Sequence, residues 1–248
     1  MADPVEGHGL AAKPGAWAEI ALTLPVFVVY QAGVVFLNVR NATDMVTSRL
    51  MDVAHGDRIT YLGLTVSIAL VLFAVFAVKG RGQALRGSKI AQIVVEGAAY
   101  AIAMSTATSW IVGKLFAGPP AGAMTGPFAG VVMSLGAGFY EELAFRVVLF
   151  GLGAKVLVWL LGHQQVGLVG AAPRLSLRSI LIMVTWALSC AALFSGMHYL
   201  GALGDPFELK SFVARMVLGL ALTLVYASRG FAAAVWTHAL YDVWVLVL

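Results

Sequence analysis

The chain has 248 residues, of which 60% are hydrophobic and only 11% are charged, and its mean hydropathy is +0.90. A soluble domain of this length carries roughly twice that charged fraction, so the composition argues against a soluble protein. The net charge of +4 is spread over short loops between apolar segments, which is typical of membrane topology and argues against nucleic-acid binding. The single cysteine, Cys190, excludes an intrachain disulfide and a cysteine-based zinc cluster.

Seven apolar segments follow one another along the chain, and runs of this length are typical of membrane helices. The tail before them, 1–15, is too polar to begin a secretory signal peptide, so we expect an uncleaved integral membrane protein. We expect an all-α, polytopic transmembrane helix bundle with about seven or eight membrane helices around an intramembrane polar cavity. The segments lie at 16–39, 60–78, 90–116, 128–161, 179–200, 211–227 and 231–248.

Three stretches between or within these segments carry further predictions. The mixed-charge connector 40–58 is predicted to form an interfacial amphipathic helix. The loop 79–89 is the most basic and is the candidate for the cytoplasmic side. The segment 128–161 is too long for one ordinary crossing, so it either protrudes from the bilayer or splits near Gly136 and Gly138.

A pair of adjacent carboxylates and an arginine lies inside that long apolar segment. Glu142 and Arg146 are four residues apart on one helix face, with the acid first, which is the favourable order for an ion pair. Pairing lowers the cost of burying both charges. Glu141 is turned about 100° away on an α-helix, so Arg146 need not neutralise it. The sequence therefore predicts a structural role for Glu142 and a chemical role for Glu141.

Two later apolar segments contain further polar pairs at the same spacing of four. The ring of Phe194 is placed to limit the orientation of His198, and His238 shares a helix face with Asp242. If the helices converge, Glu141 can activate water, while the imidazoles orient that water or stabilise an oxyanion. Glu141, His198 and His238 are also groups that bind zinc, so a divalent metal site is a second hypothesis. Ionisable groups at membrane depth indicate a functional site.

Two acidic residues in the earlier segments do not belong to these motifs. Glu19 lies near the start of the first segment and Glu96 lies in the third. We expect each to take part in helix packing or in substrate contact.

The three motifs, in this order and spacing, resemble the signature of the CPBP family. This family comprises CAAX proteases and bacteriocin-processing enzymes, and it is also called the Abi family of intramembrane proteases. Its pattern is Glu-Glu-x-x-x-Arg, then Phe-x-x-x-His, then His-x-x-x-Asn or His-x-x-x-Asp. The resemblance covers 128–248, so we expect a polar tail at 1–15, N-terminal membrane helices at 16–127 and a catalytic core at 128–248 within one membrane domain.

The resemblance implies a membrane endopeptidase with the following roles. Glu141 would be the base that activates water, assisted by His198, while Glu142 and Arg146 would hold the helix geometry. His238 and Asp242 would stabilise the oxyanion. Relatives that act on CAAX proteins have Asn where this chain has Asp242, and an ionised Asp cannot donate a hydrogen bond to an oxyanion. Asp242 is therefore either protonated or orients His238.

Other protease types fit the residues less well. A rhomboid-like serine protease would use Ser195 with His238 as its base, although Phe194 stands where a glycine is usual before the serine. A presenilin-like aspartyl protease would pair Asp242 with Asp205, which lies beside a proline in a predicted turn. Neither type accounts for Glu141.

The sequence therefore predicts hydrolysis of a peptide bond in a membrane-embedded or lipid-anchored protein. A prenylated CAAX protein, a bacteriocin leader and a C-terminal tail are all compatible substrates. The composition, rich in alanine and glycine, favours a bacterial inner membrane as the location. The non-enzymatic alternatives are an immunity or scaffold protein, or a transporter, although the chain shows no pair of related halves.

Overall fold

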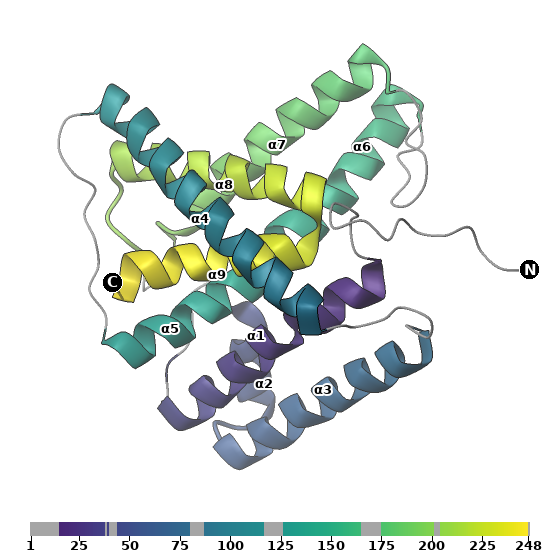
Figure 1. The fold of residues 1–248 in the computed structure, drawn as a ribbon, viewed down its shortest axis with the longest axis vertical. Helices are drawn as coiled ribbons and strands as arrows, with labels where there is room; N and C mark the ends of the chain where they lie inside the picture. The colour runs from purple at the N-terminus through teal and green to yellow at the C-terminus, as the bar shows by residue number, and fades with distance from the viewer. Residues whose placement is uncertain are drawn as a thin grey trace, which may run out of the picture.

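The computed structural model describes residues 15–37, 39, 44–79, 87–116, 126–164, 175–200 and 204–247. All regular secondary structure within these residues is helical, which confirms the predicted all-α class. In chain order the helices are α1 (Ala16–Leu37), α2 (Met45–Val53), α3 (Arg58–Lys79), α4 (Gly87–Leu115), α5 (Pro127–Gly136), the π-helix η1 (Ala137–Leu152), α6 (Gly153–Gly162), α7 (Leu177–Met197), α8 (Leu209–Arg229) and α9 (Phe231–Val247) (Figure 1).

Six helical stretches in the described part of the chain are long and apolar enough to cross a membrane. They are α1, α3, α4, the continuous run from α5 to α6, α7 and α8. Large apolar side chains lie exposed on them, as on α3, where Leu70 and Val71 face outward, and such a surface suits contact with lipid. The chain is therefore an integral, multi-pass membrane protein. The seventh predicted segment forms α9, which has 17 residues and is shorter than these six stretches.

α9 lies in the centre of the bundle. Four consecutive residues near its start, 232–235, have no exposed surface. Helices α4, α5, α8 and η1 pack against it, and in Figure 1 α4 crosses α9 while α8 runs next to it. Because α9 is surrounded by protein, it can carry polar side chains at a lower cost than a helix that faces lipid.

The long segment 128–161 does not split at its two glycines. The chain is helical without interruption over Pro127–Gly162, a length of 36 residues. Only the geometry changes, because the α-helix of α5 continues as the π-helix η1 over 16 residues before α6. π-helical turns are rare in proteins, and those that do occur often lie at functional sites.

Gly136 and Gly138 allow two other helices to approach this long helix closely. A Cβ atom on Gly136 would lie 2.3 Å from Cε2 of Tyr30 on α1. A Cβ atom on Gly138 would lie 2.8 Å from the carbonyl oxygen of Val235 on α9. The absence of a side chain therefore serves helix packing at both positions and does not break the helix.

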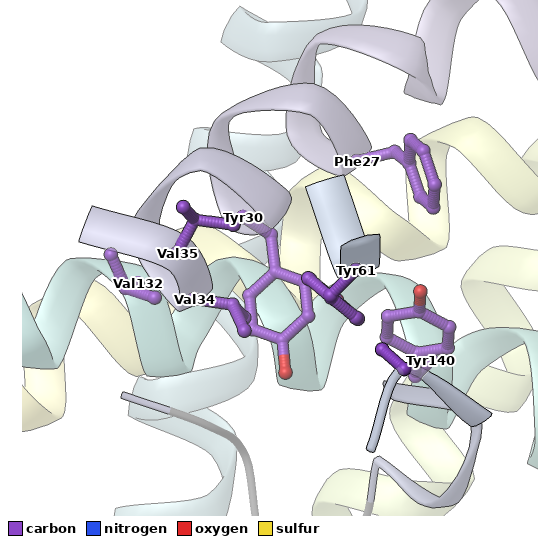
Figure 2. Packing of buried hydrophobic residues seen from close by; sticks show 8 residues of the cluster. Phe27, Tyr30, Val34, Val35, Tyr61, Val132 and Tyr140 are labelled. Atoms are coloured by element: carbon purple, nitrogen blue, oxygen red, sulfur yellow. The ribbon is translucent and has the colours of Figure 1, made fainter. Parts of the chain in front are cut away.

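The N-terminal helices form a core of their own against the long helix. The predicted helix in the connector 40–58 is present as α2, and Asp44 caps its start by accepting a hydrogen bond from the backbone N–H of Thr47 at 2.8 Å. Figure 2 shows the aromatic centre of this core, where Tyr30 of α1, Tyr61 of α3 and Tyr140 of η1 come together. Residues close to the first motif thus pack against helices far earlier in the chain.

Glu19 and Glu96 both take part in helix packing. Glu19 Oε2 accepts a hydrogen bond of 2.6 Å from the backbone N–H of Ala232 at the start of α9, where a negative charge complements the helix dipole. Glu96 on α4 forms an ion pair of 2.8 Å with Arg229 at the end of α8. Both acids therefore hold N-terminal helices to the C-terminal ones.

Two predictions fall on residues that the structure does not describe. The polar tail before Gly15 and positions 80–86 of the basic loop lie outside the described residues. The division into a tail at 1–15, N-terminal helices at 16–127 and a core at 128–248 stays a prediction.

Candidate active site

The three polar motifs lie on three helices that meet inside the bundle. The first motif lies on η1, the second at the end of α7, and the third on α9. Contacts between charged or aromatic groups connect every pair of these helices. The convergence brings together the seven residues singled out in the sequence, which are Glu141, Glu142, Arg146, Phe194, His198, His238 and Asp242.

Glu142 connects the buried charges. Its Oε1 lies 3.1 Å from Nη1 of Arg146, which confirms the predicted ion pair. The same oxygen lies 2.7 Å from Nδ1 of His238, a contact that spacing along the chain could not indicate. Arg146 also donates a hydrogen bond from Nη2 to the carbonyl oxygen of Gly219 on α8, at 3.4 Å. Since a buried charge is stable only with partners, this carboxylate holds η1 and α9 together.

The ring of Phe194 packs against all three cationic or ionisable nitrogen groups of the site. The guanidinium of Arg146 lies 4.3 Å from the ring centroid, a cation–π contact. The imidazoles of His198 and His238 lie edge-on to the ring, with centroids 5.2 and 5.9 Å away. The predicted packing of Phe194 against His198 is confirmed, and the ring also limits the orientation of His238.

The carboxylate of Glu141 faces His198. Glu141 Oε2 lies 4.0 Å from Nε2 of His198, which is too long for a direct hydrogen bond and short enough for both atoms to contact one water molecule. Nδ1 of His198 lies 3.0 Å from the carbonyl oxygen of Phe194. A carbonyl only accepts, so the neutral ring carries its proton on Nδ1 and presents the lone pair of Nε2 toward Glu141.

His198 follows the last residue of α7 and lies beyond the apolar span. Burial lowers the pKa of its imidazole, while the nearby charge of Glu141 acts in the opposite direction. The net direction is downward, so the ring is neutral at pH 7 and Nε2 is available to accept a hydrogen bond.

His238 lies between two carboxylates. Its Nδ1 donates to Glu142, and its Nε2 lies 3.5 Å from Oδ2 of Asp242, one turn further along α9. Of the two roles left open for Asp242, this contact favours orientation of the His238 ring.

The site is open on the side of His198 and Asp242. Their side chains are 24% and 20% exposed, whereas those of Glu142 and Arg146 are at most 1% exposed. An apolar groove between α6 and α7 lies elsewhere and is lined by none of the motif residues.

Ser195 and Asp205 do not take part in this cluster. The hydroxyl of Ser195 is buried and donates to the carbonyl oxygen of Phe212 on α8, at 2.8 Å. The carboxylate of Asp205 forms an ion pair with Arg215. The serine and aspartyl protease alternatives therefore have no support in these contacts.

The residues proposed for a metal do not form a ligand set. In the described part of the chain, no three His, Cys, Asp or Glu side chains are arranged to hold a metal ion. Nδ1 of His238 already contacts Glu142 at 2.7 Å, and its Nε2 lies 3.5 Å from Oδ2 of Asp242. A zinc site needs three protein ligands directed at one point, and these side chains do not fit that requirement.

The fold and the site define a polytopic helical membrane protein with a buried cluster of carboxylates and imidazoles that opens to one side. Residues 123–244 match a family described as type II CAAX prenyl endopeptidase, Rce1-like. This match includes all seven motif residues and confirms the resemblance, so the chain belongs to the CAAX endopeptidase family over about half of its length. No curated protein and no solved structure matches the chain. The family is one of proteases, and its membership implies a membrane-associated peptide as substrate.

Proposed function

We propose that the chain is an intramembrane endopeptidase in which Glu141 activates water. The observation that supports this role is the 4.0 Å separation of Glu141 Oε2 from the lone pair on Nε2 of His198, on the open side of the cluster. Both atoms can accept a hydrogen bond from the same water molecule, which places its oxygen for attack. Glu142 and Arg146 already neutralise one another, so the base is the neighbouring carboxylate.

The proposed reaction is hydrolysis of a peptide bond. Glu141 takes a proton from water as the oxygen bonds to the carbonyl carbon, and the carbonyl oxygen becomes an oxyanion. A protonated His238, held by Glu142 and oriented by Asp242, donates Nε2–H to that oxyanion. The proton held by Glu141 then passes to the nitrogen as the carbon–nitrogen bond breaks, leaving a carboxyl group and an amine.

The proposed substrate is a membrane-embedded or lipid-anchored protein or peptide. A prenylated CAAX protein, a bacteriocin leader and a C-terminal tail remain the candidate types, and a bacterial inner membrane remains the proposed location. The apolar surface of the six long helices supports delivery of the substrate through the bilayer. The proposed reaction has no step that uses a metal, because no three His, Cys, Asp or Glu side chains among the described residues are arranged to hold one.

The decisive experiment compares the wild-type chain with Glu141→Gln in proteoliposomes. The probe is a fluorogenic farnesylated peptide that ends in a CAAX sequence, and membrane proteins of the host cell are surveyed in parallel for new termini. We expect Glu141→Gln to lose at least about 100-fold in rate, as is typical for removal of a general base. The control is Glu208→Gln, which changes an exposed acid outside the cluster.

Two further arms decide between mechanisms. Ser195→Ala is expected to keep wild-type cleavage, whereas a serine protease would lose it. A membrane-permeant chelator is expected to leave the rate unchanged, and loss that zinc restores would establish metal-assisted hydrolysis instead. If Glu141→Gln cleaves both probe and host substrates at the wild-type rate, the proposed function is wrong.

A further inference from the structure

The N-terminal helices reach the proposed catalytic base through its neighbour in the chain. The family match begins at residue 123, so α1, α2 and α3 lie before it. Tyr140 directly precedes Glu141 on η1, and its hydroxyl accepts a hydrogen bond of 2.6 Å from Nε2 of Gln31 on α1. A polar bond inside the bundle therefore joins a helix outside the matched region to the turn that presents Glu141.

Gln31 is held in turn by α3. Its Oε1 accepts a hydrogen bond from the hydroxyl of Tyr61, and that hydroxyl also lies 3.3 Å from Oγ1 of Thr47 on α2. Tyr61 and Thr47 have no exposed surface, and Gln31 is 4% exposed. Because the amide of Gln31 has one partner at its oxygen and one at its nitrogen, its side chain is fixed in a single orientation.

Aromatic packing fixes the ring of Tyr140 as well. The ring lies edge-on to Tyr30, with centroids 5.6 Å apart, and edge-on to Phe139 at 5.2 Å. Tyr30 reaches this place because Gly136 has no side chain. Figure 2 labels Tyr30, Tyr61 and Tyr140 as members of this cluster. Packing sets the plane of the Tyr140 ring, and the bond from Gln31 sets the position of its hydroxyl.

Apolar packing alone would be enough to join α1 to the long helix. The contacts instead include a chain of buried hydrogen bonds through Gln31 to Tyr140, and each such group is costly to bury without a partner. A buried polar network of this kind specifies one arrangement of the helices in preference to similar ones. One fixed arrangement of the helices is needed here, because the proposed chemistry requires Glu141 to lie at a defined distance from His198.

We propose that Gln31 and Tyr140 are positioning residues, and that the N-terminal helices use their hydrogen bond to hold Glu141 at the correct distance from His198. This inference rests on the proposed function. Neither residue contacts the reacting atoms, so their effect passes through the backbone of η1. Loss of the bond should therefore lower kcat with little change in KM, because the open side where substrate binds is unaltered.

The test uses Gln31→Leu, Tyr140→Phe and the double variant in the full-length chain in proteoliposomes, with the farnesylated CAAX peptide as probe. Each single variant is expected to lose about 10- to 100-fold in kcat, the effect of a misplacement of about 1 Å at a catalytic group. The double variant is expected to lose no more than Gln31→Leu alone, because Gln31→Leu already removes the bond to the Tyr140 hydroxyl. Effects that multiply would overturn the inference.

The matched control is Tyr30→Phe. This change removes a buried tyrosine hydroxyl of the same cluster, which donates to Asp44 at 2.6 Å, and leaves the bond between Gln31 and Tyr140 in place. We expect kcat to stay within about twofold of wild type. If Tyr30→Phe and Tyr140→Phe lower kcat equally, the cluster acts only through stability and the inference is wrong.

A second measurement needs no substrate. Amide hydrogen exchange in nanodiscs is expected to increase around residues 137–146 in Gln31→Leu and Tyr140→Phe, and to increase around 44–53 in Tyr30→Phe. Unchanged exchange at 137–146 would overturn the positioning role even if the chain proved to be no protease. Conversely, loss of cleavage in Glu141→Gln with wild-type cleavage in Tyr140→Phe would contradict only the positioning role.

Discussion

Two buried polar clusters meet the same long helix, one at Tyr140 and the other at Glu142, and they are built from different chemistry. The cluster around Glu142 uses full charges, with Arg146 and His238 on one carboxylate oxygen. The cluster around Gln31 uses an amide and tyrosine hydroxyls. The charged cluster depends on each partner, since removal of one leaves an unpaired charge. The neutral cluster is less destabilised by the removal of one hydrogen-bonding group, and its contribution is a fixed arrangement of the helices.

The molecule thus separates a charged cluster beside Glu141 from a neutral one that supports the same helix. In the charged cluster Glu142 is held by Arg146, so the adjacent Glu141 is the carboxylate that faces His198. Among the described residues, the hydrogen bonds of the neutral cluster involve no arginine or lysine that would compete for that carboxylate. Support can therefore come close to the proposed base, at Tyr140, without altering its charge.

The largest effect on stability is expected from breaking the charged cluster. Arg146→Met leaves Glu142 buried beside His238 alone, and we expect the free energy of unfolding to fall by about 3–5 kcal/mol. The double variant Glu142→Gln with Arg146→Met removes both charges and is expected to recover part of that loss. Reversible unfolding in bicelles measures both. Equal losses in the two variants would show that the charge of Glu142 is not what the arginine stabilises.

A smaller effect is expected where helices approach the two glycines. Gly138→Ala forces a methyl group against the backbone of α9, and Gly136→Ala forces one against the ring of Tyr30. Each is expected to cost about 1–3 kcal/mol by overpacking, with the larger cost at Gly138 because backbone yields less than a side chain. Gly113→Ala is the control, since a Cβ atom there meets nothing within 4 Å. A stable Gly138→Ala protein would contradict the close packing of η1 on α9.

The smallest effect is expected beside the neutral cluster, at Asp44, which accepts a hydrogen bond from Tyr30. Asp44→Ala removes the cap of α2 and is expected to cost about 1 kcal/mol, whereas Asp44→Asn keeps an acceptor for the N–H of Thr47 and is expected to cost less. Thermal unfolding in detergent compares the two variants. Equal costs would indicate that the charge of Asp44, and not its capping bond, carries the contribution.

Asp44 is also expected to make the stability of the fold depend on pH. Burial raises the pKa of Asp44, against hydrogen bonds from Thr47 and Tyr30 that lower it. A carboxyl group with a raised pKa stabilises the fold most below its ordinary pKa, and this contribution is lost as the pH rises through the folded-state value. Asp44→Asn is therefore expected to flatten the fall in stability above about pH 4.

The contacts that the sequence predicted are all local. The pairs Glu142 with Arg146, Phe194 with His198 and His238 with Asp242 are each four residues apart, so a helix alone brings them together. The bond from Glu142 to His238 joins residues 96 apart. Nothing in a single sequence marks such a partner, because helix packing decides it.

The other features of the structure that could not be predicted from the sequence also depend on more than local spacing. The bond between Gln31 and Tyr140 spans 109 residues, and its residue types are ordinary in a membrane helix. The π-helical geometry of η1 was also beyond prediction, since an apolar run does not distinguish i to i+4 bonding from i to i+5 bonding. Gly136 and Gly138 were correctly singled out, but a glycine that breaks a helix and one that admits a neighbour look alike in sequence.

The uninterrupted 36-residue helix ties the proposed chemistry to the thickness of the bilayer. Its α-helical turns rise about 1.5 Å per residue and its π-helical turns somewhat less, so it is roughly 50 Å long, well beyond a hydrocarbon core of about 30 Å. Such a helix must tilt or extend past the core, and the extent of tilt and protrusion depends on the acyl-chain length of the lipids. Glu141 lies within this helix, so the depth of its carboxylate in the membrane changes with the tilt and protrusion of the helix. If Glu141 is the base, as proposed, lipid composition thereby determines how far a peptide bond must enter the membrane before Glu141 can reach it.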